Sequence, residues 1–111
     1  MIKGDGMSLA DQIKDDIKSN PIILYMKGTK LMPMCGFSST VVNILNAYAV
    51  EYKAVNVLED PEIRVKLSEY SDWPTIPQLY VKKEFIGGCD IVKELFEKGD
   101  LKKLFEDKKI I

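Results

Sequence analysis

The sequence IILYMKGTKLMPMCGFS, residues 22–38, decides how this chain folds. Residues 22–27 are mostly apolar or β-favouring and lie between a proline and a glycine, which predicts a short buried strand. Residues 28–34 are expected to form a loop, and a helix is expected over about residues 35–49. The inner face of that helix is marked by residues at helical spacing, namely Val41, Ile44, Leu45 and Tyr48.

Apolar periodicity and turn residues extend this unit in both directions. Upstream, a helix is expected over residues 8–19, with Ser8 as its cap. Downstream, residues 53–57 alternate as a strand does, and Asp60 followed by Pro61 predicts the start of another helix. The core face of that helix is expected to carry Ile63, Leu67 and Tyr70.

The last third of the chain predicts a hairpin and two helices. Two prolines prevent a regular helix over residues 73–77. Residues 78–87 then fit two strands that are joined by a two-lysine turn. Asp90 is expected to cap a helix over residues 91–98, and a final helix is expected to begin at Asp100.

The predicted order of elements is α-β-α-β-α-β-β-α-α. It contains a parallel connection through a helix and, later, an antiparallel hairpin. Together these predict an α/β fold in which a four-stranded mixed sheet is flanked by helices. Residues 8–111 are expected to form a single domain, and residues 1–7 a flexible N-terminal extension.

Composition excludes several classes of function. The 111 residues carry 16 Lys and Arg against 17 Asp and Glu, so neither nucleic acid nor a membrane is an expected partner. The chain has no histidine, which excludes Cys–His dyads and imidazole metal ligands. Its two cysteines indicate free thiols in a reducing compartment, either the cytoplasm or an organelle matrix.

Cys35 lies at the predicted start of a helix, where unpaired backbone N–H groups and the helix dipole stabilise a thiolate. A stabilisation of about 0.3–2 kcal/mol lowers a thiol pKa by roughly 0.2–1.5 units. Lys27 can bring a cation to the same rim, or it can bind an anionic ligand. The alternative is that Cys35 is a small buried apolar residue and Lys27 a surface charge.

Ser38 decides which kind of redox site Cys35 can form. A Cys-x-x-Cys pair closes its own disulfide, whereas Cys-Gly-Phe-Ser cannot. Turnover as a dithiol is therefore excluded unless Cys89 reaches Cys35. Gly36 allows close backbone approach. Phe37 either covers the thiol, forms part of a docking surface or only fills a gap.

Two later segments can bind a ligand through their backbones. Taken alone, residues 75–77 predict an ordinary trans turn, whereas a cis bond before Pro77 would let the backbone of Ile76 pair with an extended peptide. Residues 87–90 contain two glycines ahead of a helix, where free N–H groups suit a carboxylate. Asp90 can accept a hydrogen bond from a ligand's amino group, or it can simply cap the helix.

These motifs occur in one order along the chain: Lys27, Cys35-Gly36-Phe37-Ser38, Trp73-Pro74-Thr75-Ile76-Pro77-Gln78-Leu79-Tyr80, and Gly87-Gly88-Cys89-Asp90. In this order and spacing they resemble the monothiol, CGFS-type glutaredoxins of the thioredoxin superfamily, over about residues 8–105. Two residues depart from the family pattern. Lys30 stands where relatives often have proline, which predicts a less rigid loop, and Ile76 replaces the more usual Phe or Val.

The resemblance implies a thioredoxin fold, a cis bond before Pro77 and a glutathione molecule across the site. Cys35 would be the nucleophile or an iron ligand. Lys27 would meet a glutathione carboxylate, and Cys89 and Asp90 would hold the γ-glutamyl end. The full set of glutathione-binding residues that it implies is Lys27, Arg64, Ile76, Pro77, Gly88, Cys89 and Asp90.

Three functions follow from this site. A [2Fe–2S] cluster needs four ligands, so one Cys35 from each of two chains and two glutathione thiols predict a cluster-bridged homodimer. That dimer would serve iron–sulfur cluster assembly, storage or transfer, with assembly or acceptor proteins as partners. The alternative is a glutathione-dependent thiol–disulfide oxidoreductase that removes glutathione from proteins through Cys35, with Cys89 as a resolving thiol. The third is a redox-inert adaptor that uses Phe37.

Overall fold

The computed structural model describes residues 8–111, so the extension expected over residues 1–7 lies outside the described residues. The elements are α1 (Leu9–Ser19), β1 (Ile22–Met26), α2 (Gly36–Ala47), β2 (Lys53–Asn56), the 3-10 helix η1 (Val57–Glu59), α3 (Pro61–Ser71), β3 (Gln78–Val81), β4 (Glu84–Gly87), α4 (Cys89–Glu97) and α5 (Asp100–Asp107). Apart from η1, their order is the predicted one.

The four strands form one mixed sheet in the order β2-β1-β3-β4. Strand β1 pairs in parallel with β2, and Ile23 lies opposite Lys53. It pairs antiparallel with β3, and Leu24 lies opposite Leu79. Strand β4 completes the sheet as an antiparallel partner of β3. The predicted α/β class is therefore confirmed.

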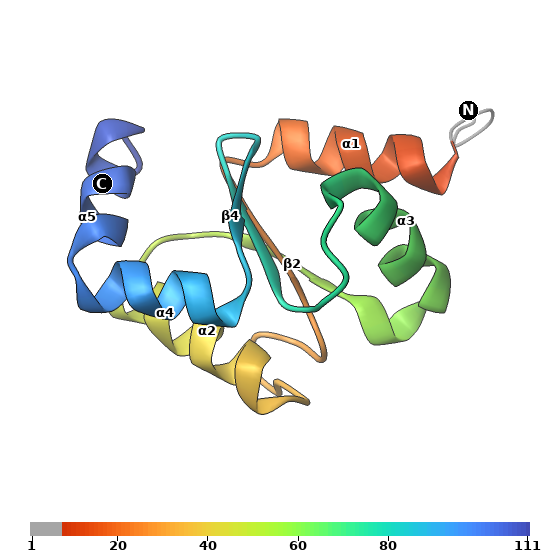
Figure 1. Ribbon diagram of the computed structural model, residues 1–111, viewed down its shortest axis with the longest axis horizontal. Coiled ribbons are helices and arrows are strands. Elements are labelled where there is room, and N and C mark those ends of the chain that lie inside the picture. Colours follow the sequence, from red (N-terminus) through yellow and green to blue (C-terminus); the bar gives the residue numbers. More distant parts are fainter. Residues whose placement is uncertain (1–7) are drawn as a thin grey trace.

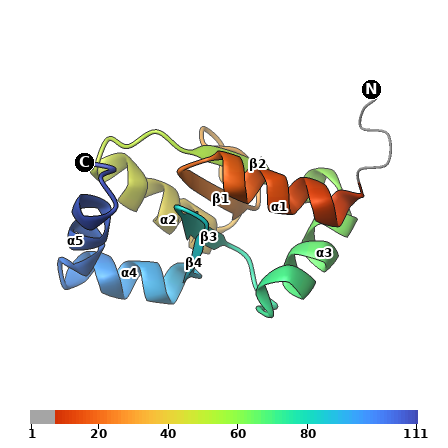
Figure 2. The same cartoon turned by 90° about the horizontal axis from the view of Figure 1, so that it is seen from above.

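Strand β1 is buried on both faces because helices cover both sides of the sheet. Its side chains alternate between two cores, as the pleat of a strand requires. Ile22, Leu24 and Met26 pack in a core with residues of α2, α4 and α5. Ile23 and Tyr25 pack in a second core with residues of α1 and α3. Figures 1 and 2 show the two helix groups on opposite sides of the strands.

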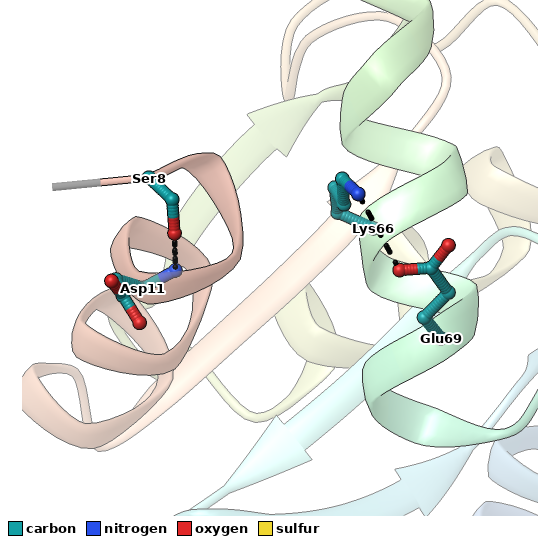
Figure 3. A network of polar contacts seen from close by, with 4 residues as sticks. All are labelled: Ser8, Asp11, Lys66 and Glu69. Atoms are coloured by element: carbon teal, nitrogen blue, oxygen red, sulfur yellow. Dashed lines mark hydrogen bonds and ion pairs between the residues drawn. The ribbon is translucent and has the colours of Figure 1, made fainter.

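Capping residues fix where two of the helices begin. The backbone N–H of Asp11 donates to Ser8 Oγ at 3.1 Å, as predicted for the start of α1 (Figure 3). Asp60 Oδ1 accepts from the backbone N–H of Glu62 at 3.0 Å at the start of α3. Each cap satisfies a backbone donor that would otherwise have no partner in the helix. Figure 3 also shows an ion pair on the neighbouring helix, α3.

Three local predictions are corrected by the structure. Val57 lies in η1 and not in a strand, because Asn56 Oδ1 accepts from the backbone N–H of Leu58 at 3.0 Å and turns the chain. Tyr70 is 42% exposed and so does not belong to the buried core of α3. Asp90 does not cap α4, because the extended Gly88 already occupies that position and α4 begins at Cys89.

The peptide bond between Ile76 and Pro77 is cis. The family resemblance implies this isomer, whereas the segment alone predicts a trans turn. Trans bonds dominate before proline in general, so the local sequence favoured the wrong isomer.

None of the helices described over residues 8–111 has the length and the apolar character needed to span a membrane.

Candidate functional site

Cys35 is the N-cap of α2 and is partly exposed. No side chain caps this helix at Cys35, so its first backbone N–H groups are available to the sulfur. Hydrogen bonding from the backbone N–H of Ser38 is the largest influence on this thiol, and it lowers the pKa of Cys35 below its usual value. Desolvation opposes that effect, while Phe37 N–H, the Ser38 hydroxyl and the Lys27 charge add to it. The thiolate is therefore favoured at this position.

The loop before Cys35 folds back on the end of β1. The backbone N–H of Met34 donates to Lys27 O at 2.9 Å, and Gly28 forms an isolated bridge with Pro33. Gly28 has a φ of +94°, and a Cβ there would lie 2.6 Å from Met34 N. Only glycine fits this position without moving the loop. The fold-back is what returns the chain to Lys27 just before Cys35.

A lysine ties the loop to the edge of the sheet. Lys30 Nζ donates to the backbone carbonyl of Tyr52 and lies 4.0 Å from the centroid of the Tyr52 ring. Thr29 and Met32 close the loop on itself, with Thr29 N donating to Met32 O at 3.1 Å. The sequence predicts a less rigid loop because Lys30 replaces a proline, and this stays a prediction. The Lys30 side chain does provide a contact with Tyr52 that proline cannot offer.

Several apolar side chains that are close to Cys35 in the sequence face solvent. Leu31 is 95% exposed, and Met32, Met34 and Phe37 are each more than 60% exposed. Single exposed apolar residues are ordinary, but a group of them next to a reactive residue marks a contact surface. This arrangement favours the docking-surface interpretation of Phe37 over its use as a gap-filler.

A cavity of about 190 Å³ lies beside α4 and the segment that precedes β3. It is lined by Phe37, Trp73, Thr75, Pro77, Gly88, Cys89, Asp90 and Ile91. Four residues that the family resemblance implied for glutathione therefore meet in one place: Pro77, Gly88, Cys89 and Asp90. Phe37 connects the cavity to Cys35, which lies two residues earlier in the chain.

The other three residues that the resemblance implies for glutathione binding do not line this cavity. Lys27 lies at the end of β1, close enough for its charge to act on Cys35. The side chain of Ile76 packs in the core under α1 and α3. Its backbone N–H and C=O have no hydrogen-bond partner among residues 8–111. Arg64 is exposed on α3 and is not part of the cavity lining.

The two thiols of the chain differ in character. Desolvation is the main influence on Cys89 and raises the pKa of its thiol, and the neighbouring Asp90 carboxylate raises it further. The Cys35 sulfur also contributes, so the two sulfurs lie within electrostatic reach of each other. At neutral pH the thiolate is therefore favoured at Cys35 more than at Cys89, whose raised pKa keeps its thiol protonated beside the cavity.

Sequence reasoning did not select three residues of the cavity lining. Trp73 and Thr75 belong to a motif that was recognised, yet only their position around the cavity assigns them to the site. Ile91 follows Asp90 in the first turn of α4 and is 43% exposed. The sequence signal for this residue was its position directly after Asp90, a predicted binding residue.

One chain offers few ligands to a metal. Within residues 8–111, no three Cys, Asp, Glu or His side chains gather in a group that could hold a metal ion. Cys35 could therefore offer a metal only one thiolate, and any iron bound there would need further ligands from elsewhere. Its lowered pKa and its exposure fit the thiolate ligation that iron–sulfur clusters use.

Known proteins resemble this chain in sequence and in fold. The Glutaredoxin family model matches residues 22–86. A probable monothiol glutaredoxin 2 of Rickettsia typhi is 56% identical over 95 residues, which cover 86% of each chain.

Solved structures give the same result. A monomeric truncated mutant of Trypanosoma brucei 1-C-Grx1 has a TM-score of 0.85 and 43% identity and covers 96% of both chains. A buckwheat glutaredoxin, solved as a glutathione complex, has a TM-score of 0.81 over 93% of this chain and 92% of its own, with 22% identity, which supports the fold alone. The predicted family is thereby confirmed: this chain belongs to the glutaredoxins and is a monothiol member of that family.

Proposed function

We propose that this chain binds glutathione and, as a homodimer, carries a [2Fe–2S] cluster that it holds for transfer to acceptor proteins. The observation that carries the proposal is the single, partly exposed Cys35 with a lowered pKa at the start of α2. The cluster is cargo in this account, and the protein supplies the thiolate and the surface around it.

The cavity supports the glutathione part of the proposal. The first N–H groups of α4 have no side-chain cap and suit a carboxylate. Asp90 lines the cavity and can accept a hydrogen bond from the ammonium of a γ-glutamyl group. The free backbone of Ile76 can pair with the extended tripeptide as an added strand does. Lys27 and Arg64 remain the proposed partners of the other carboxylate.

Ligand counting supports the dimer. A [2Fe–2S] cluster requires four ligands, and this chain has one thiolate at the rim to give. Two chains and two glutathione thiols complete the set. The exposed apolar residues Leu31, Met32, Met34 and Phe37 give a second copy an apolar surface to contact. Because two of the four ligands belong to small dissociable molecules, the cluster is expected to leave readily for an acceptor.

Anaerobic reconstitution with iron, sulfide and glutathione tests this proposal. The wild-type protein is expected to become coloured and to gain visible absorption bands from its thiolate-bound cluster. Cys35→Ser should gain none, while Cys89→Ser, which keeps both the rim thiolate and the backbone N–H of residue 89 at the start of α4, should still gain them. The proposal is wrong if the wild type stays colourless under conditions that load a related monothiol glutaredoxin, or if Cys35→Ser loads equally well.

A second function is favoured by the same lowered pKa. The Cys35 thiolate can attack the sulfur of a protein–glutathione mixed disulfide, which releases the protein thiolate and leaves glutathione on Cys35. A glutathione thiolate then attacks that new disulfide, which releases oxidised glutathione and restores Cys35. A deglutathionylation assay tests this activity. Brisk turnover that Cys35→Ser abolishes would support the enzyme over the carrier.

A further inference from the structure

The segment that forms one wall of the cavity has little backbone support of its own. Residues 73–77 connect α3 to β3, and within residues 8–111 no backbone–backbone hydrogen bond holds them. Pro74 and Pro77 have no N–H to donate. Trp73, Thr75 and Pro77 nevertheless line the cavity. Something other than regular secondary structure must therefore fix this wall.

The side chain of Gln78 supplies that support. It is fully buried at the first position of β3, where it lies opposite Tyr25 of the central strand. Its Nε2 donates to Trp73 O at 2.9 Å and to Thr75 O at 3.1 Å. One amide group, anchored in the sheet, thus holds two carbonyls of the wall segment.

A third hydrogen bond fixes the orientation of this amide. Tyr80 OH donates to Gln78 Oε1 at 2.9 Å. Burial raises the pKa of Tyr80 to about 12, so its hydroxyl keeps its proton at neutral pH. With Oε1 accepting from Tyr80, the NH₂ group of Gln78 must face the two carbonyls. Every polar atom of the Gln78 side chain has a partner, which is what a buried amide requires.

We propose that Gln78 is a positioning residue for the cavity: its amide holds Trp73 and Thr75 where they can meet glutathione. The inference rests on the proposed binding of glutathione, which Gln78 itself does not touch. Ser71 Oγ adds a weaker tie, accepting from Trp73 N at 3.2 Å. That bond is at the α3 end, and within the described residues 8–111 only Gln78 donates a hydrogen bond to Thr75 O.

Trp73 makes the proposal directly measurable. It is the only tryptophan of the chain, so intrinsic tryptophan fluorescence reports on the wall segment. S-methylglutathione is a suitable ligand, because it lacks a free thiol and reports binding without redox or cluster chemistry. The fluorescence titration gives its Kd, and acrylamide quenching gives the accessibility of Trp73 without any ligand.

Four proteins are compared: wild type, Gln78→Leu, Tyr80→Phe and Leu101→Val. Gln78→Leu removes both donors, and the Kd is expected to rise about tenfold because the wall must be ordered on binding. Its Trp73 should also be quenched more strongly. Tyr80→Phe keeps both donors and should stay within about threefold of the wild-type Kd. Leu101→Val weakens the opposite core and controls for lost stability.

The outcomes separate a positioning role from a structural one. If Gln78→Leu binds and quenches as the wild type does, or if Leu101→Val weakens binding equally, the proposal is wrong. If Gln78→Leu does not fold, Gln78→Met, which is unbranched and about as long as glutamine but has no donor, takes its place with the same expectations. If the wild type binds no S-methylglutathione, the proposed function fails, and acrylamide quenching alone decides the role of Gln78.

Discussion

The backbone N–H of Lys27 donates a hydrogen bond of 3.1 Å to Ser38 Oγ, which joins the end of β1 to the first turn of α2. Ser38 is fully buried, and its backbone N–H is the main influence that lowers the pKa of Cys35. The serine that replaces a second cysteine in this motif is therefore a structural part of the site. It holds the helix start against the strand that carries Lys27.

Ser38→Ala separates the two roles of this residue. The variant should lose about 1–3 kcal/mol in free energy of unfolding, since the amide of Lys27 loses its buried acceptor. The pKa of Cys35 should rise only partly toward its usual value, because the backbone N–H of residue 38 remains. Urea unfolding and the pH dependence of Cys35 alkylation measure the two effects. A Cys35 pKa equal to that of a free thiol would contradict this division.

The two thiols are expected to titrate in opposite directions from the usual value. The pKa of Cys35 is lowered and that of Cys89 is raised, and only the thiolate reacts with iodoacetamide. As pH rises, alkylation of Cys35 should therefore reach half its maximum rate first, and at pH 7 it should be the faster of the two. Peptide mass spectrometry after timed labelling distinguishes the sites. Equal rates, or faster labelling of Cys89, would show that the helix start does not activate Cys35.

Lys30→Met tests the anchor of the active-site loop. It removes the hydrogen bond to Tyr52 O and the cation over the Tyr52 ring while it keeps a long side chain. A loss of about 1 kcal/mol would speed amide exchange at Thr29, Met32 and Met34 by roughly fivefold. Hydrogen exchange by NMR measures this directly, with amides of α5 as an internal control. Unchanged exchange in the loop would mean that its own turn bonds suffice.

Tyr25→Phe is expected to leave the fold intact and to cost no stability. Tyr25 is buried, and its hydroxyl has no hydrogen-bond partner among residues 8–111. Desolvation of that hydroxyl already opposes folding, so its removal should change the free energy of unfolding by about 0 to 1 kcal/mol in favour of the native state. Urea denaturation gives this value. A loss of more than about 1 kcal/mol would imply a partner for the hydroxyl.

The sequence predicted the order of helices and strands along the chain, the two-lysine hairpin and Cys35 at the start of α2, because these features depend on local pattern and on turn chemistry. Other features depend on bonds between residues that no local pattern joins. The turn at Val57 depends on the Asn56 side chain. The anchor of the loop depends on Lys30 reaching Tyr52. The same reason explains why the cavity wall escaped prediction, since its position depends on Gln78.

The residues that the family resemblance implies for glutathione show the same division. Pro77, Gly88, Cys89 and Asp90 meet because one short motif precedes β3 and the other begins α4. Arg64 came from the family resemblance alone, and its place on the exposed surface of α3 puts it outside the cavity lining. Its role in binding remains a prediction, which an Arg64→Gln titration with S-methylglutathione would examine.

Native mass spectrometry of the anaerobically loaded protein tests the central claim most directly. The account predicts one species whose mass equals two chains, two glutathiones and a single [2Fe–2S] cluster, since each chain lends only the Cys35 thiolate. A loaded monomer, or a loaded dimer that contains no glutathione, would contradict it.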